Sequence, residues 1–290
     1  MIKISIIVTT ARLGGLDVLV NTLAQQTMSP NEWELILVDE YWKDRRHLLE
    51  GVQLPIKHLP PRRITDVYDN SAGFNCALRE ATGELVTVLT DFVWLYPGYL
   101  EAHWSWYQKH PGYSMTSYVD RYVPPLVVLV ESRKYWSVFA QDFTNEYANY
   151  FFQNSHPEYK ERKGGIVGDP LAGGWPWEMP GSMIYLLGDS IPLRVLKELN
   201  GFDEAYDSGY GSNDIDIGVR ANMLGWKFVL NPRSIVYKLG TPTSSRVLPG
   251  VNKQRLRTAA ANYQIFLNRV AAIQAAQEAV AVPKGRGAWA

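Results

Sequence analysis

Three continuous apolar runs near the N-terminus constrain the fold more than any other feature of the chain. They read KISIIVTT (3–10), WELILVDE (33–40) and ELVTVLTD (84–91), and they are rich in β-branched residues. Such runs predict strands that are covered on both faces, as in a parallel sheet. Between them lie GLDVLVNTLAQQT and NSAGFNCALREATG, whose apolar residues recur with helical spacing. This alternation of strands and helices predicts an α/β fold with right-handed crossovers.

Weaker signals continue the alternation through the rest of the chain. Apolar spacing, with the turn residues that flank it, predicts two more short strands and three more helices. The predicted strands are PIKHLP (55–60) and SMIYLLG (182–188), and the predicted helices are GYLEAHWSWYQKH (98–110), a stretch around 141–153, and PLRVLKELN (192–200).

The C-terminal part of the chain predicts a helical extension. We expect an alanine-rich helix from Lys253 to Val280, followed by a loose PKGRGAWA tail. One stripe of this helix is formed by Leu256, Ala260, Tyr263 and Leu267. We expect that stripe to pack on the core or on a second subunit, so the helix offers a route to an oligomer. Its polar face lacks the strong basic character of a helix that lies on a membrane.

Composition and charge narrow the class of protein. Lys plus Arg and Asp plus Glu are equal at 29 each, so no overall field favours nucleic acid or an anionic membrane. The single cysteine, Cys76, rules out a disulfide framework within the chain and fits a reducing compartment. No apolar run approaches the ~18 residues of a membrane-spanning helix, and the N-terminal run is too short for a signal peptide. We therefore expect a soluble, cytoplasmic protein.

Polar side chains follow the predicted strands at their carboxyl ends. Thr9 and Thr10 end the first strand, Asp39 ends the second, and Asp91 ends the strand at 84–91. Open α/β sheets bind their ligands at this edge, because the loops that leave the strands there diverge around a crevice. These side chains therefore predict a binding site.

Two more acids, Asp214 and Asp216, lie in GYGSNDIDIGVR (209–220), in the first turn of a predicted helix. Acids at this place cap the helix and interact favourably with its dipole, so one interpretation is purely structural. The other is a general base that faces the same edge as the strand-end acids. Asp216 and Arg220 are four residues apart, which predicts a salt bridge along the helix.

Five stretches, in order, carry a resemblance to a known family. They are SIIVTTARLGGLDVLVNTLAQQT, ELILVDE, NSAGFNCALREATGELVTVLTD, GFDEAY and NDIDIGVRANMLGWKFVLNP, within residues 3–240. The chain resembles inverting glycosyltransferases of family 2 type with the GT-A fold. GYGSNDIDIGVR is also similar to the Gly-Gly-Glu-Asp-Asp-Asp stretch of galactosyltransferase-like members.

The resemblance implies an architecture as well as an activity. The expected fold is α/β, a GT-A (Rossmann-like) and mostly parallel sheet flanked by helices, with a C-terminal helical extension. Residues 1–100 would form the nucleotide-sugar-binding half and residues 101–245 the acceptor-binding and catalytic half of the same domain. Residues 246–290 would form the C-terminal helix and its tail.

The resemblance also implies roles in a hexosyltransferase-like reaction with a UDP-sugar donor. Asp214 falls on the family's catalytic position, where it would take the proton from an attacking acceptor hydroxyl. Asp39 would accept the uracil N–H, and Asp216 would hold the acceptor or stabilise the helix start. The other donor-binding residues would be Thr9, Thr10, Arg12, Asn75, Asp91 and Lys238. Trp175 and Trp177, in GGWPWEMPG, are candidates to stack on an acceptor sugar.

The sequence departs from this family at its metal positions. The family has an Asp-x-Asp or Asp-Asp-Asp triplet, and the same register here reads Thr90-Asp91-Phe92. A His that commonly supplies the second ligand is replaced by Lys238. One hypothesis is that Lys238, with Arg12 or Arg62-Arg63, supplies positive charge to the leaving diphosphate in place of a metal. The other is that Asp91 alone anchors Mg²⁺ or Mn²⁺, with waters and phosphates as further ligands.

Two other functions are compatible with the sequence. A non-catalytic nucleotide-sugar-binding protein on the same fold is favoured by the lost acids and disfavoured by the retained Asp214. A sugar nucleotidyltransferase needs a Gly-rich, basic loop after the first strand, which TTARLGGL matches only faintly. The sequence leaves the acceptor open among saccharides, lipid-linked glycans, proteins and modified nucleic acid. The neutral net charge neither indicates nor excludes nucleic acid.

Overall fold

The computed structural model describes residues 1–11, 15–62, 70–91, 93–95, 97–122, 177–207, 209, 211–239 and 251–281. The predicted helix around 141–153, together with Arg12 and Trp175, lies outside these residues. The described strands are β1 (Ile4–Thr10), β2 (Trp33–Asp39), β3 (Ile56–Leu59), β4 (Leu85–Thr90), β5 (Val93–Leu95), β6 (Tyr113–Tyr122), β7 (Trp177–Met179), β8 (Asp189–Pro192) and β9 (Lys227–Leu239). The described α-helices are α1 (Leu16–Ala24), α2 (Trp42–Arg45), α3 (Asn70–Glu80), α4 (Tyr99–Lys109), α7 (Leu193–Glu198), α8 (Asn213–Met223) and α9 (Val251–Ala281).

All these strands belong to one sheet, in the order β3-β2-β1-β4-β8-β6-β9-β5, with β7 also paired to β9. β3, β2, β1 and β4 are parallel to one another, with Ile7 of β1 opposite Ile36 of β2 and Val88 of β4. β8 joins this half in the antiparallel direction. Helix α1 connects β1 to β2 and helix α3 connects β3 to β4, as the alternation in the sequence predicts. The carboxyl ends of β1, β2 and β4 therefore lie side by side at one edge.

Both faces of the sheet are covered, because alternate residues of each strand enter two different cores. On one face, Ile7 of β1 packs in a core with Phe74 of α3 and Ile217 of α8. On the other face, Ile6 packs in a core with Leu19 of α1. Full burial of such a side chain contributes about 1.5–3 kcal/mol, so both layers of helices fix the strands and the edge that they form.

The prediction of a strand at 182–188 is wrong. Its first residues belong to a short 3-10 helix, Gly181–Met183, and the strand itself begins only at Asp189. Leu186 and Gly188 have positive φ angles of 52° and 119°, which interrupt an extended run. Apolar spacing also gives no sign of β5, which has three residues, or of β6, whose sequence YSMTSYVDRY mixes polar and apolar residues.

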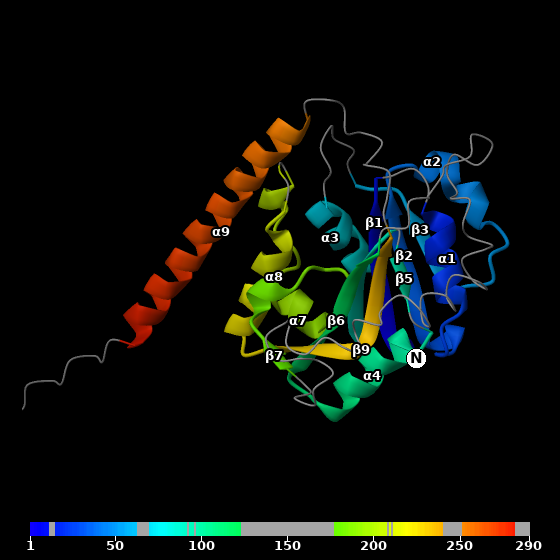
Figure 1. Cartoon of the computed structure of the whole chain (residues 1–290), viewed down its shortest axis with the longest axis horizontal. Coiled ribbons are helices and arrows are strands. Elements are labelled where there is room, and N and C mark those ends of the chain that lie inside the picture. The colour runs from blue at the N-terminus through cyan, green and yellow to red at the C-terminus, as the bar shows by residue number, and fades with distance from the viewer. Residues whose placement is uncertain are drawn as a thin grey trace, which may run out of the picture.

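Helix α9 extends past the body of the molecule at its C-terminal end (Figure 1). Tyr263 and Leu267 of the predicted stripe are 52% and 40% exposed, so the expectation that this stripe packs on the core is wrong. Asn262 and Phe266, one position earlier, are buried in its place. Contact with a second subunit stays a prediction. No helix among the described residues, α9 included, is long and apolar enough to cross a membrane.

Candidate active site

Side chains tie the carboxyl ends of β1 and β4 together at the edge of the sheet. The Thr10 hydroxyl donates a hydrogen bond of 2.6 Å to Oδ2 of Asp91, and both residues are buried. Thr9 donates a hydrogen bond of 2.6 Å to Oδ1 of Asn70, at the start of α3. An added Cβ at Gly73 would lie 2.6 Å from the Thr9 methyl group, so α3 approaches β1 closely. The structure thus brings three predicted donor residues together beside the first turn of α3.

Asp39, at the end of β2, is the centre of a buried polar cluster. Its Oδ1 accepts hydrogen bonds from the Tyr41 N–H (2.8 Å) and from Arg45 (2.5 Å), and its Oδ2 lies 2.9 Å from Nε2 of His58. Burial acts to raise the pKa of Asp39, but His58 and the charge of Arg45 outweigh it and lower that pKa. Asp39 and Arg45 have no exposed surface. A uracil N–H can therefore reach this carboxylate only after a neighbouring group moves aside.

The backbone register places Lys238 at the same end of the sheet as Asp91. Strand β5 begins two residues after Asp91, and its Val93 pairs with Lys238 of β9. Paired residues in an antiparallel ladder lie about 5 Å apart. This position is compatible with a role beside the strand-end acid, and the role itself stays a prediction.

The segment 201–207, GFDEAYD, connects α3 with α8. The Asn75 amide of α3 donates to the Phe202 carbonyl (2.8 Å), and its oxygen accepts from the Phe202 N–H (2.8 Å). Asp207 accepts two backbone N–H bonds, of 2.7 and 2.8 Å, in the first turn of α3. Such a carboxylate satisfies N–H groups that have no partner within the helix and interacts favourably with the helix dipole. Asn75 therefore has a structural task, and its contact with the donor stays a prediction.

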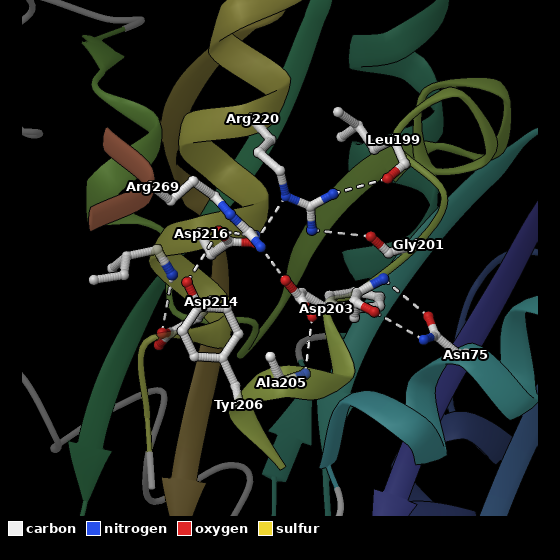
Figure 2. Close-up of polar contacts among 12 residues, drawn as sticks. Asn75, Leu199, Gly201, Asp203, Ala205, Tyr206, Asp214, Asp216, Arg220 and Arg269 are labelled. Carbon is white, nitrogen blue, oxygen red and sulfur yellow. Dashed lines mark hydrogen bonds and ion pairs between the residues drawn. The ribbon is translucent and has the colours of Figure 1, made fainter. Parts of the chain in front are cut away.

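Asp216 is the centre of an ion cluster between α8 and α9 (Figure 2). Its Oδ2 accepts from Nε of Arg220 at 2.7 Å, which confirms the predicted salt bridge. Its Oδ1 accepts from Arg269 at 2.6 Å and from the Tyr206 hydroxyl at 3.1 Å. Arg269 also pairs with Asp203 of the GFDEAYD segment. Asp216 is only 1% exposed, so direct contact with an acceptor would require one of these partners to leave.

Asp214 lies beside this cluster, in the first turn of α8 (Figure 2). Its Oδ1 accepts the N–H of Ile215 at 2.9 Å, and none of the ion pairs among the described residues includes it. Burial raises the pKa of Asp214, against the lowering effect of the backbone N–H groups of Ile215 and of Asp214 itself. A half-buried carboxylate that has a raised pKa and no ion-pair partner among the described residues is suited to accept a proton.

The turn before Asp214 has an unusual backbone. Gly211 and Ser212 have φ angles of 78° and 71°, in the left-handed region. Glycine adopts this conformation freely, whereas it costs other residues roughly 1–2 kcal/mol. The Asn262 amide of α9 donates to the carbonyl oxygens of Gly211 (3.0 Å) and Tyr206 (2.9 Å), so α9 contacts this turn directly.

Several residues of these clusters were not expected from the sequence, among them Arg45, His58, Asn70, Asp203, Tyr206, Asp207, Asn262 and Arg269. A signal exists only on α9, where Asn262 and Arg269 are polar residues two turns apart in an alanine-rich helix. Of the predicted acceptor residues, Trp177 lies in β7 opposite Leu230 of β9. Its stacking on an acceptor sugar stays a prediction.

Metal ligands are sparse in the part of the chain that the structure describes. Nowhere in it do three His, Cys, Asp or Glu side chains gather as ligands for an ion. Asp91 supplies one carboxylate at the strand end, and its neighbours in the metal-binding register are Thr90 and Phe92. In the register where the family resemblance implies metal ligands, Asp91 is the one carboxylate, and Lys238 stands where the second ligand is expected.

No protein-family model matches the chain, and no curated protein sequence does. Among solved structures, the chain is similar to S. aureus TarS 1–349 in complex with UDP-GlcNAc, with a TM-score of 0.56, 12% identity, and coverage of 86% of this chain and 61% of that chain. For TarS 1–349 in complex with UDP, the TM-score is 0.53 and the identity 14%, with coverage of 83% of this chain and 61% of that chain. For a further structure of S. aureus TarS, the TM-score is 0.52 and the identity 15%, with coverage of 83% of this chain and 37% of that chain. The chain thus spans about three fifths of the first two structures. What it shares with them is the GT-A-like α/β fold.

Proposed function

We propose that the protein is an inverting glycosyltransferase of the hexosyltransferase type, which moves a sugar from a UDP-sugar donor to an acceptor hydroxyl. The observation that carries the proposal is Asp214, a half-buried carboxylate outside every ion pair of the described residues. The GFDEAYD segment fastens the helix of Asp214 to α3 at the predicted donor edge. The structures of TarS with UDP and with UDP-GlcNAc support a nucleotide-sugar ligand for this fold.

Asp214 acts as the general base of a single displacement. The acceptor oxygen forms a bond to the anomeric carbon while the bond from that carbon to the UDP diphosphate breaks. The hydroxyl proton passes to the Asp214 carboxylate, and the electron pair of the broken bond leaves with UDP. Attack from the face opposite the leaving group inverts the anomeric configuration. A positioned base contributes ~10²–10⁴ in rate, and the raised pKa of Asp214 makes it a stronger base.

The donor lies at the carboxyl edge of β1, β2 and β4, where sheets of this type bind nucleotides. Asp91, held by the Thr10 hydroxyl, accepts a hydrogen bond from a ribose or donor-sugar hydroxyl. Asp39 accepts the uracil N–H once a neighbouring group moves. The remaining donor contacts in this proposal are Thr9, Arg12 and Asn75.

Positive charge is required where the diphosphate leaves, because negative charge builds up there as the bond breaks. In this proposal Lys238 supplies it, and the backbone pairing of Lys238 with Val93, two residues after Asp91, supports that role. An ammonium group about 4 Å from a phosphate oxygen attracts it by ~4 kcal/mol at an effective dielectric of ~20, before desolvation. The competing arrangement, in which Asp91 anchors a divalent ion by itself, is separated from this one by the final experiment of the Discussion.

On the acceptor side of this proposal, the attacking hydroxyl lies against Asp214. Trp175 and Trp177 stack on the acceptor, and Asp216 orders the first turn of α8 through its ion cluster or meets the acceptor after a partner leaves. The acceptor is a glycan or another molecule that carries a hydroxyl group.

Release of UDP from a panel of UDP sugars tests the proposal, with and without candidate acceptors. Asp214→Asn keeps the shape of the side chain but removes the base, so we expect UDP release to fall ~10²–10⁴-fold. Glu198→Gln, an exposed change on α7, is the matched control and should leave the rate unchanged. Proton NMR of the first product should show an inverted anomeric centre. Binding of UDP sugars without turnover would favour a non-catalytic binding protein instead, and retention of configuration would contradict inversion.

A further inference from the structure

The inward face of α9 is polar where it meets the catalytic half of the molecule. Asn262, Phe266 and Arg269 are spaced i, i+4 and i+7, which places them on one side of a helix. Asn262 is 1% exposed and Phe266 is 9% exposed, whereas Tyr263 and Leu267 face outward. An apolar residue at 262 would bury the helix at least as well, so this asparagine requires an explanation other than packing.

Asn262 holds the turn that leads into α8 at several points. Its amide nitrogen donates to the carbonyl oxygens of Tyr206 and Gly211, which lie five residues apart on either side of the turn. A Cβ added at Gly209 would lie 2.5 Å from Oδ1 of Asn262, so the turn packs flat against the amide group. The Asn262 side chain therefore links two points of the loop that precedes Asp214 through its hydrogen bonds.

The backbone at this place needs such support. Ser212, directly after Gly211, has a positive φ that is costly for a residue with a side chain, and strained backbone persists only where surrounding contacts fix it. The hydrogen bond to the Gly211 carbonyl acts on the peptide unit between these two residues. Asp214 follows two residues later, so a rotation of this unit would displace its carboxylate.

Arg269 supplies a second attachment two turns along α9. It pairs with Asp216, two residues after Asp214, and with Asp203 of the GFDEAYD segment (Figure 2). Its guanidinium thus balances two carboxylates that belong to different elements. Together, Asn262 and Arg269 bracket Asp214 from both sides along the chain.

We propose that Asn262 and Arg269 make α9 part of the active site, as positioning residues that fix Tyr206, Gly211 and the first turn of α8 and so orient Asp214. This inference rests on the proposed role of Asp214 in glycosyl transfer. In this proposal α9 acts neither in the chemical step nor in donor binding, and its effect is confined to the position of the Asp214 carboxylate.

The test compares Asn262→Asp and Asn262→Ala with wild type, and Asn268→Ala as the matched control. Asp is isosteric with Asn but cannot donate to the two carbonyl groups. Asn268 is an exposed asparagine on the same helix, with Gln264 as a partner. Amide hydrogen exchange of the free protein is measured by peptide mass spectrometry, and UDP-sugar turnover is measured for kcat and KM separately.

We expect both Asn262 variants to speed exchange in peptides that cover 209–216 by about tenfold or more, with peptides of β1 and β4 unchanged. We also expect kcat to fall about tenfold or more while KM for the donor changes less than about twofold. The Asn268 variant should match wild type. Unchanged exchange at 209–216, or faster exchange with unchanged kcat, overturns the proposal.

Two further measurements keep these outcomes distinct. If the Asn262 variants do not fold, two other variants take their place. Gly209→Ala displaces the turn from the side opposite Asn262, and Arg269→Lys keeps the charge but loses the forked contact with the two carboxylates. Both should give faster exchange at 209–216 and a lower kcat. If wild type releases no UDP from any donor, the proposed glycosyltransferase function fails. The exchange data then still decide whether Asn262 fixes the turn, because they need no substrate.

Discussion

The hydroxyl of Thr10, at the end of β1, donates a 2.6 Å hydrogen bond to Oδ2 of Asp91, just beyond the end of β4. The two residues are 81 positions apart in the chain, and the parallel pairing of β1 with β4 brings them together. This contact gives the strand-end acid a fixed orientation, and its neighbours in the sequence, Thr90 and Phe92, are not carboxylates. A single oriented acceptor is suited to a hydroxyl group, whereas a metal ion prefers several oxygen ligands.

Thr10→Val tests this relationship, because valine keeps the branched shape and removes the hydroxyl. A hydrogen bond to a charged group contributes about 1.5–3 kcal/mol, so we expect the free energy of unfolding to fall by about that much. Loss of orientation at Asp91 should also weaken UDP-sugar binding about tenfold, as measured by calorimetry. Thr27→Val, at an exposed position, is the control. Unchanged donor affinity in a folded Thr10 variant would separate Asp91 from the donor.

Asn75→Ala separates the structural task of Asn75 from its predicted donor contact. The change removes both hydrogen bonds to Phe202, so chemical denaturation should show a loss of about 2 kcal/mol. Asn75→Asp can still accept from the Phe202 N–H and should lose part of that stability. The exposed Asn31→Ala serves as the reference. If UDP affinity is the same in all three variants as in wild type, Asn75 does not contact the donor.

Asp189 predicts a dependence of stability on pH. This buried carboxyl accepts the Tyr185 N–H, and burial raises its pKa from 3.8 to about 6. The folded protein therefore binds the proton more tightly than the unfolded chain, and stability should decrease as pH rises from about 4 to about 6. A shift of about two units corresponds to at most roughly 3 kcal/mol. Thermal melts across this range should show the decrease in wild type and a flatter profile in Asp189→Asn, with Asp44→Asn as the exposed control. Parallel pH profiles for wild type and Asp189→Asn would contradict the assignment.

Gly218→Ala should destabilise the fold, because α8 passes very close to the segment before β8. A Cβ at Gly218 would lie 2.0 Å from the carbonyl oxygen of Gly181, and a Cβ at Gly181 would lie 2.1 Å from that of Gly218. Overpacking of this kind costs about 1–3 kcal/mol. Val219→Ala, the neighbouring half-buried position, controls for a change in the same helix turn. Urea denaturation checks the difference, and equal midpoints for Gly218→Ala and wild type would show that the backbones can separate at little cost.

The sequence predicts the parallel half of this fold well because local patterns determine it. The continuous apolar strands β1, β2 and β4 and the helices α1 and α3 lie where their patterns place them. The antiparallel half is harder, because β5 is too short for a periodic signal and the run before Asp189 contains two residues with positive φ. Neither feature can be seen in the spacing of apolar residues.

In the candidate site, too, some residues can be predicted from local sequence patterns and others cannot. Strand-end residues such as Thr10 and Asp91 are predictable, since the carboxyl ends of neighbouring parallel strands must meet. Contacts across long sequence distances are not predictable, because they depend on how separate elements pack. Arg269 reaches Asp216 over 53 positions, and Asn262 reaches Gly211 over 51. On α9 the outward stripe is more apolar than the inward one, so a rule based on hydrophobicity selects the wrong face.

Calorimetric titration of UDP, in EDTA and with added Mn²⁺, tests the central claim most directly. The proteins are wild type, Lys238→Ala and Lys227→Ala, the last an exposed control at the start of the same strand. We predict that UDP binds wild type in EDTA, and that its affinity falls about tenfold or more in Lys238→Ala but not in Lys227→Ala. Binding only with Mn²⁺ and without sensitivity to Lys238 would contradict the role of this lysine and leave Asp91 as a single metal anchor. Absence of uridine nucleotide binding under both conditions would contradict the proposed donor site itself.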